Sequence, residues 1–166
     1  MKIFLVGMPG SGKSTLGKQA AEFLGAGFVD LDAEVEKSEG KSIPEIFSGS
    51  GEEYFRQVEA RLLREWAAST LPFVMATGGG APCFHGGMDI INEHGISVFL
   101  DCTVDELVER VKRNRERPLL LSSDEEELRK KLNTMLSTRK DCYSKAKIIL
   151  HKPSLESLLK ELRIRR

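Results

Sequence analysis

The chain has 166 residues, enough for one hydrophobic core, and is predicted to form a single domain over residues 1–166. Its 25 basic and 25 acidic residues cancel, so the composition predicts no nucleic-acid partner and no anionic membrane. No apolar run approaches the roughly 20 residues of a membrane span, and three widely spaced cysteines without a C-x-x-C pair argue against disulfides and against a zinc site. A soluble cytoplasmic protein is expected.

Short runs of β-forming residues alternate with stretches of helical periodicity along the chain. In chain order, the sequence predicts strand 3–6, helix 14–24, strand 28–32, a broken helical stretch 33–47, helix 51–68, strand 73–77, helix 88–93, strand 97–100, helix 103–113, helix 123–140, strand 147–150 and helix 154–162. This alternation predicts an α/β fold in which helices flank a five-stranded parallel sheet and the crossovers are right-handed.

The sequence GMPGSGKS at residues 7–14 fits the phosphate-loop pattern G-x-x-x-x-G-K-[ST]. Glycines let the amides of such a loop turn inward, and the following helix directs its positive end at the phosphates. Lys13 is expected to reach the β- and γ-phosphates, and Ser14 to bind Mg²⁺. A glycine-rich turn without a chemical role is the alternative, but the position between a strand and an amphipathic helix favours nucleotide binding. Motors, switches, ligases and kinases share this loop, so it does not specify the reaction.

Two carboxylates, Asp30 and Asp32, end the second predicted strand, where an extended chain places both on one face. Ligands of open α/β sheets bind beyond the carboxyl ends of the strands. One carboxylate could belong to the Mg²⁺ shell while the other orients and deprotonates an acceptor hydroxyl. The spacing is equally compatible with Asp32 simply capping the next helix.

Glu52, Arg56 and Glu59 share one face of the helix predicted over residues 51–68. Residues at this spacing often form a surface ladder of ion pairs, and the spacing alone favours that interpretation. The functional alternative is an arginine fork for a substrate carboxylate, with Glu59 holding the guanidinium in place.

Three consecutive glycines, Gly78, Gly79 and Gly80, follow the third predicted strand. A flexible turn is one interpretation. Each glycine carries an entropic cost, however, so three in a row favour a backbone that a ligand approaches closely.

A polar stretch before Pro118 contains four arginines, Arg110, Arg113, Arg115 and Arg117. Proline ends the preceding helix and favours an extended chain, so residues from about 113 to 123 are interpreted as a mobile lid. Such a lid could bring an arginine to a transferring phosphoryl group. Basic residues near a helix C-terminus, including Arg139, are alternatively explained by the helix dipole.

Together these motifs resemble the shikimate kinases along nearly the whole chain. They occur in that family's order: GMPGSGKST at 7–15, VDLD at 29–32, I-x-x-I-F at 43–47, G-E-x-x-F-R-x-x-E at 51–59, G-G-G at 78–80, R-P-L-L at 117–120 and R-x-x-x-Y at 139–143. The resemblance implies a P-loop kinase fold like that of the nucleoside monophosphate kinases, with strand order 2-3-1-4-5 and a mobile lid. It also implies transfer of the γ-phosphoryl group of ATP to the 3-hydroxyl of shikimate, on the route to chorismate and the aromatic amino acids.

Carried over position by position, the resemblance implies roles for individual residues. Asp32 would bind the acceptor hydroxyls and act as the base, in a catalytic set of Lys13, Asp32 and Arg117. The implied ATP-binding set is Gly10, Ser11, Gly12, Lys13, Ser14, Thr15, Arg110 and Arg117. The implied shikimate-binding set is Asp32, Arg56, Gly78, Gly79, Gly80 and Arg139, with Glu59 steadying the pocket. Ser14, and Asp30 through water, would hold Mg²⁺.

Two stretches depart from the family's pattern. Residues 150–153 (LHKP) lack the arginine that often makes the C-terminal adenine contact, and residues 81–87 are richer in glycine and proline. The rival enzymes are small P-loop kinases that act on gluconate or on a nucleoside monophosphate. Neither gives a reason for two arginines and an aspartate pair at these spacings. ATP and shikimate are the expected ligands, and a monomer is the default expectation.

Overall fold

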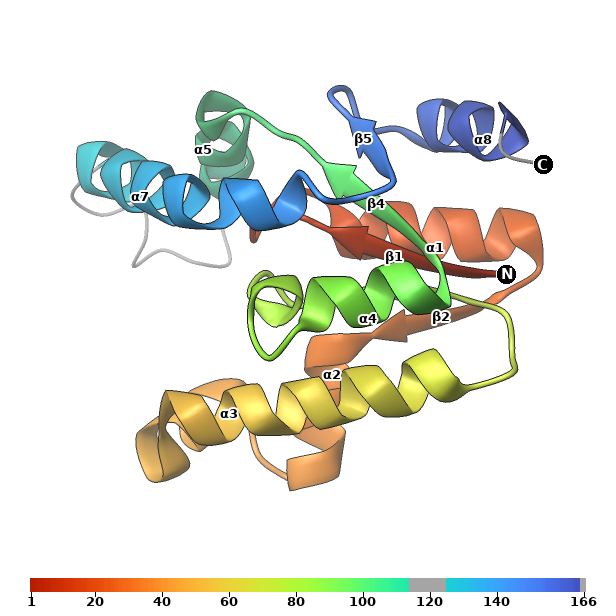
Figure 1. Ribbon diagram of the computed structural model, residues 1–166. Coiled ribbons are helices and arrows are strands. Elements are labelled where there is room, and N and C mark those ends of the chain that lie inside the picture. The colour runs from red at the N-terminus through yellow and green to blue at the C-terminus, as the bar shows by residue number, and fades with distance from the viewer. Residues whose placement is uncertain (114–124, 165–166) are drawn as a thin grey trace.

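Five parallel strands form one sheet at the centre of the molecule, in the order β2-β3-β1-β4-β5 (Figure 1). The computed structural model describes residues 1–113 and 125–164. The strands are β1 (Lys2–Val6), β2 (Gly27–Asp30), β3 (Phe73–Ala76), β4 (Ile96–Leu100) and β5 (Ile148–Leu150). The predicted fold class and strand order are therefore confirmed.

Helices cover both faces of the sheet, with α1 and α8 on one face and α3 and α4 on the other (Figure 1). The helices are α1 (Lys13–Leu24), α2 (Leu31–Glu39), α3 (Ile43–Ala68), the short 3-10 helix η1 (Ala81–Cys83), α4 (Gly87–His94), α5 (Val104–Arg113), α7 (Glu125–Tyr143) and α8 (Leu155–Ile164). The predicted lid, with Arg115 and Arg117, lies outside the described residues apart from Arg113 at the end of α5.

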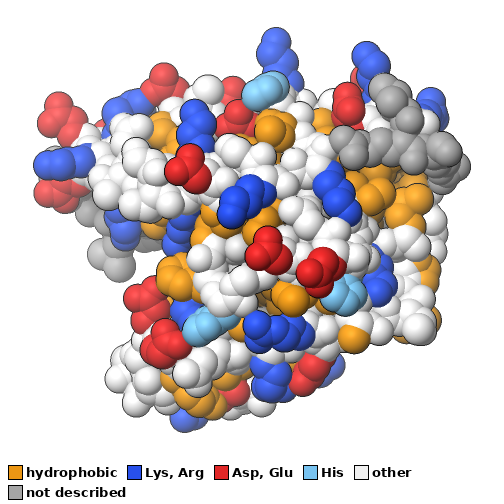
Figure 2. Space-filling model, viewed as in Figure 1, with side chains coloured by type: hydrophobic (Ala, Val, Ile, Leu, Met, Phe, Trp, Pro, Cys, Tyr) orange, Lys and Arg blue, Asp and Glu red, His pale blue; other side chains and the backbone are white. Residues whose placement is uncertain are grey.

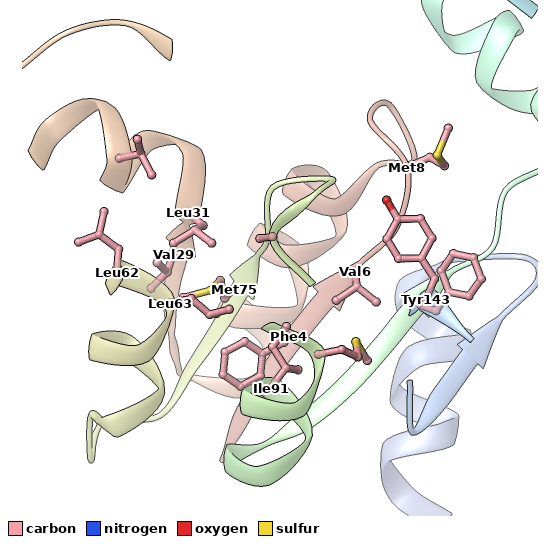
Figure 3. Packing of buried hydrophobic residues seen from close by; sticks show 14 of the residues in the cluster. Phe4, Val6, Met8, Val29, Leu31, Leu62, Leu63, Met75, Ile91 and Tyr143 are labelled. Carbon is pink, nitrogen blue, oxygen red and sulfur yellow. The ribbon is translucent and has the colours of Figure 1, made fainter. Parts of the chain in front are cut away.

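The buried side chains of β1 alternate between two hydrophobic clusters, as the pleat of a strand requires. Ile3 and Leu5 pack with α1 and α8, whereas Phe4 and Val6 pack with α3 and α4. Figure 3 shows the second cluster, where Leu63, Met75 and Ile91 are drawn with Phe4. Both faces of β1 are buried, which fits a central strand of a parallel sheet.

The carboxyl ends of β1 and β3 bring the phosphate loop and the glycine triplet together. The two strands pair in parallel from Lys2 and Phe73 to Leu5 and Ala76. Thr77 continues this pairing, because both its amide and its hydroxyl donate to the carbonyl of Leu5. Gly78 therefore leaves the sheet directly beside the loop that begins at Gly7.

The clearest difference from the predicted element boundaries is at the start of α2. The strand predicted over 28–32 ends at Asp30, and α2 begins at Leu31. The break predicted before the helix 51–68 is present as a kink within α3, where Gly51 takes non-helical angles (φ 87°, ψ 169°). Glycine tolerates this positive φ, which explains why the kink occurs there.

The surface carries charges of both signs. On the face drawn in Figure 2, Lys and Arg side chains are interspersed with Asp and Glu. Among the described residues, no helix combines the length and apolar character that crossing a membrane requires.

Candidate active site

The phosphate loop connects β1 to α1 and curls around the ammonium group of Lys13. The Nζ atom donates to the carbonyl oxygens of Gly7 (2.8 Å) and Met8 (2.9 Å). Burial lowers the pKa of Lys13 to about 8, while the negative charge of Asp32 acts in the opposite direction. A buried cation enclosed by backbone at a helix N-terminus is the arrangement that receives phosphate groups.

Gly12 is the residue before α1. Its backbone has a left-handed conformation, with φ 91°, and it makes no side-chain cap. A Cβ atom at Gly12 would lie 2.5 Å from Nη1 of Arg110, which belongs to α5. The predicted nucleotide residue Arg110 therefore lies against the phosphate loop. Cys102, which the sequence did not single out, packs beneath the same loop and donates its thiol to the carbonyl of Ser11 at 3.7 Å.

Asp30 caps α2 and faces Ser14. Its Oδ1 atom accepts from the amides of Asp32 (3.0 Å) and Ala33 (3.3 Å), while Oδ2 accepts from the hydroxyl of Ser14 at 3.4 Å. The suggestion that Asp32 is the helix cap is wrong, because Asp30 satisfies the free amides of the first turn. The two aspartates also do not share one face of a strand, since Asp32 lies in a helix.

Ser14 and Asp30 present hard oxygen atoms of the kind that Mg²⁺ binds. In the part of the chain that the structure describes, no group of three or more His, Cys, Asp or Glu side chains could hold a metal ion. Kinase sites bind Mg²⁺ through one or two protein oxygens together with phosphates and water, so a pair is sufficient. Ser14 and Asp30 therefore fit the predicted ion.

Because Asp30 provides the cap, the carboxylate of Asp32 is available for another role. Burial and the neighbouring charge of Asp30 raise its pKa, and Lys13 opposes this shift. A Cβ atom at Gly78 would lie 2.8 Å from Oδ1 of Asp32 and 2.7 Å from Oε2 of Glu59. The first glycine of the triplet thus leaves space for two carboxylates.

Arg56 and Glu59 form a buried ion pair on α3. The Nη1 atom of Arg56 donates to Oε1 of Glu59 at 2.9 Å, and the two residues are only 7% and 2% exposed. Burial raises the pKa of Glu59, and the charge of Arg56 opposes the shift. Glu52 remains exposed, at 3.6 Å from Nε of Arg56. The surface-ladder interpretation is therefore wrong for Arg56 and Glu59, since an exposed ladder would leave both in water.

The other two glycines of the triplet lie against the two arginines. A Cβ atom at Gly79 would lie 3.1 Å from Nη1 of Arg139, and one at Gly80 would lie 2.3 Å from Nη1 of Arg56. None of the three glycines has a positive φ angle. The triplet is therefore required for space, and it brings Asp32, Arg56 and Arg139 around one short segment.

Tyr143 connects α7 to this segment. It is fully buried, packs against the ring of Phe99 and donates its hydroxyl to the carbonyl of Gly79. Burial raises its pKa to about 12, so the hydroxyl keeps its proton at neutral pH. Arg139 lies one helical turn earlier, so this contact fixes the helix that carries the second arginine. The sequence showed Tyr143 within a motif but gave it no role.

Known proteins match this chain over most of its length. The family model described as Shikimate kinase matches residues 9–162. The chain belongs to the shikimate kinase family. A shikimate kinase from Parabacteroides distasonis is 40% identical over 148 residues, which cover 89% of this chain and 85% of that protein. The family predicted from the motifs is therefore confirmed.

Solved structures of shikimate kinases agree with the fold. The enzyme from Bacteroides thetaiotaomicron superposes with a TM-score of 0.88 at 35% identity, covering 99% of this chain and 97% of that one. The enzyme from Acinetobacter baumannii, solved in complex with shikimate, gives a TM-score of 0.85 at 34% identity and covers 99% and 92% of the two chains. A gluconokinase from Sinorhizobium meliloti, at 20% identity and a TM-score of 0.61, shares the fold alone.

Proposed function

We propose that this shikimate kinase family member transfers the γ-phosphoryl group of ATP to the 3-hydroxyl of shikimate, giving shikimate 3-phosphate and ADP. The product would enter the route to chorismate and the aromatic amino acids. The observation that carries the proposal is the arrangement around the glycine triplet, where Asp32, Arg56 and Arg139 surround one segment beside the phosphate loop.

The acceptor side has the groups that a carboxylated ring with hydroxyls needs. Arg56 and Arg139 are the proposed clamp for the carboxylate, because guanidinium groups bind carboxylates with two parallel hydrogen bonds. Glu59 holds Arg56 in place. A buried clamp of this kind would select an acceptor that carries a negative charge.

Asp32 is the proposed base. Its raised pKa makes the ionised carboxylate a stronger proton acceptor than an ordinary aspartate. The acceptor hydroxyl gives its proton to Asp32 while its oxygen bonds to the γ-phosphorus. The bond between that phosphorus and the β–γ bridging oxygen breaks, and ADP leaves with the bridging oxygen.

On the donor side, we propose that Lys13 and the amides of Gly10, Ser11, Gly12, Ser14 and Thr15 bind the phosphates. Arg110 would lie against the adenine. When bound, Mg²⁺ would supply positive charge that neutralises the phosphate oxygens, and Ser14 and Asp30 are the residues proposed to hold it. Most of the rate enhancement would come from positioning and charge neutralisation, because phosphoryl transfer needs little covalent participation by the protein.

Three further expectations belong to this proposal. Arg117, on a lid of about residues 113–123, would meet the transferring phosphoryl group and help to exclude water, which would otherwise hydrolyse ATP. A single domain acting as a monomer, and a cytoplasmic location, also stay predictions.

An acceptor screen tests the proposal. Purified protein with ATP and Mg²⁺ is expected to release ADP when shikimate is present and to stay near background with gluconate or a nucleoside monophosphate. Equal ADP release with either alternative acceptor would refute the assignment. In the same assay, Arg139→Ala should raise the KM for shikimate far more than the KM for ATP, and equal changes would place Arg139 in the nucleotide site instead.

A further inference from the structure

The chain between η1 and α4 folds over α3 at the position of Arg56. The ring of Phe84 lies across the guanidinium, with Cζ of Arg56 4.2 Å from the ring centroid. The ring of Phe55 also faces this guanidinium, at 5.1 Å. Phe84 is 37% exposed, whereas Arg56 is buried. A partly exposed aromatic ring thus covers a buried cation.

The turn that carries Phe84 is held on α3 at two further points. The carbonyl of His85 accepts from Nη2 of Arg64 at 3.0 Å, and its ring lies 3.1 Å from Oε1 of Glu53. His85 has a φ angle of 50°, the one positive value for a non-glycine residue in the described ranges. Such a conformation is uncommon for a residue with a side chain, although histidine adopts it more often than most, and here the surroundings hold it. The contacts with α3 therefore determine where Phe84 lies.

The charge balance explains why an aromatic ring is suitable at this position. Arg56 already pairs with one buried carboxylate, that of Glu59. The exposed carboxylate of Glu52 also lies near the Nε atom of Arg56, so a further carboxylate from the protein would leave net negative charge around the guanidinium and repel a ligand carboxylate. The face of a phenyl ring attracts the cation without adding a negative charge. The guanidinium is thus held in orientation while part of its charge stays available.

We propose that Phe84 is a positioning residue for Arg56, fixing the plane of the guanidinium so that the edge not bonded to Glu59 meets the carboxylate of the acceptor. This inference rests on the proposed function, which assigns that carboxylate to Arg56. Gly80 also lies against this guanidinium, because its missing Cβ atom leaves the space that Nη1 and Nη2 occupy. Phe84 lies in the stretch 81–87, which differs from the family's usual pattern.

The test compares Phe84→Leu, which keeps apolar bulk, with Phe84→Tyr, which keeps the aromatic face. Phe84→Leu should raise the KM for shikimate roughly threefold to thirtyfold, the range expected for loss of one cation–π contact. The kcat and the KM for ATP should stay within about twofold, because the contact acts on acceptor binding alone. Phe84→Tyr should keep the wild-type KM for shikimate. Phe23→Leu, an exposed aromatic residue on α1, is the matched control and should change none of these values.

A double variant separates action through Arg56 from direct contact between Phe84 and the acceptor. In an Arg56→Gln background, adding Phe84→Leu should change kcat/KM for shikimate by less than about twofold, because the two residues act as one unit. If Phe84→Leu lowers kcat/KM for shikimate in the Arg56→Gln background as much as it does in the wild type, the proposal is overturned. An unchanged KM for shikimate in Phe84→Leu would also overturn it, and so would an equal rise of that KM in Phe84→Tyr. Wild-type turnover of shikimate is measured first, and its absence would refute the proposed function and not the contact itself.

Discussion

Replacing Gly80 by alanine adds one methyl group at the point where Arg56 approaches the glycine triplet. The backbone of Gly80 has φ −92° and ψ −17°, which alanine adopts without strain. The added Cβ atom would lie 2.3 Å from Nη1 of Arg56 and 2.6 Å from Cζ. The perturbation is therefore steric and directed at one side chain.

The size of the effect follows from these distances. Non-bonded heavy atoms settle near 3.5 Å, so the guanidinium of Arg56 must retreat by about 1 Å. A misplacement of that size at a binding group can cost roughly 100-fold in activity, and we expect this loss in kcat/KM for shikimate. Arg56 is buried and held by Glu59 and Phe84, so the free energy of unfolding should fall by about 1–3 kcal/mol, the usual cost of overpacking a buried site.

Steady-state kinetics with each substrate varied in turn measures this prediction. The KM for shikimate should rise while the KM for ATP stays close to that of the wild type, because Lys13 and the phosphate loop are untouched. Gly49→Ala is the matched control. Gly49 lies in α3, no described atom lies within 4 Å of its added Cβ, and alanine should favour the helix by up to about 1 kcal/mol.

A wild-type KM for shikimate in Gly80→Ala would refute the reasoning, because it would mean that Arg56 does not bind the acceptor from this position. A loss that persists when Gly80→Ala is added to Arg56→Ala would also contradict it. In that case the methyl group would act on the acceptor directly.

Three other predictions concern separate parts of the site. Asp32→Asn should lower kcat at least about 100-fold as the base is lost, and a kcat within about tenfold of wild type would exclude that role. The raised pKa of Asp32 keeps it protonated to higher pH in the native than in the unfolded state, so its own contribution to the unfolding free energy should fall as pH rises from about 4. When the unfolding free energy is measured by urea titration at several pH values between acidic and neutral, Asp32→Asn should lack this contribution. Equal pH dependence of the unfolding free energy in the variant and the wild type would contradict the assignment. Gly12→Ala adds about 1–2 kcal/mol of backbone strain and a contact with Arg110, so it should weaken ATP binding while shikimate binding persists; equal weakening of both would be evidence against a nucleotide-side role. Tyr143→Phe removes the hydrogen bond to Gly79 and should cost about 1 kcal/mol in urea unfolding, more than Tyr54→Phe at an exposed site; an equal or smaller cost would contradict the role of that bond.

The fold was largely predictable from local patterns. Alternating strands and helices predicted the parallel sheet, and the context of the phosphate loop predicted the nucleotide side of the site. The strand order came from the resemblance of the motifs to a family, because periodicity does not determine which strands are neighbours. The start of α2 was missed because residues 28–32 alternate in polarity like a strand, although Leu31 begins a helix capped by Asp30.

The acceptor side was less predictable from local patterns. Glu52, Arg56 and Glu59 have the spacing of a surface ladder, and no local signal distinguishes that ladder from a buried pair. The burial of Arg56 depends on Gly80 and Phe84, which follow β3 and not the segment that precedes α3. The contact between Tyr143 and Gly79 joins residues that are 64 positions apart. Long-range contacts of this kind are absent from any single window of sequence.

The central claim is tested most directly by identifying the phosphorylated product. The protein is incubated with ATP, Mg²⁺ and shikimate, and ¹H and ³¹P NMR spectra establish which oxygen carries the phosphate. We predict shikimate 3-phosphate and ADP in equal amounts. Inorganic phosphate with unchanged shikimate, or phosphate on another hydroxyl, would contradict the geometry proposed for Asp32, Arg56 and Arg139.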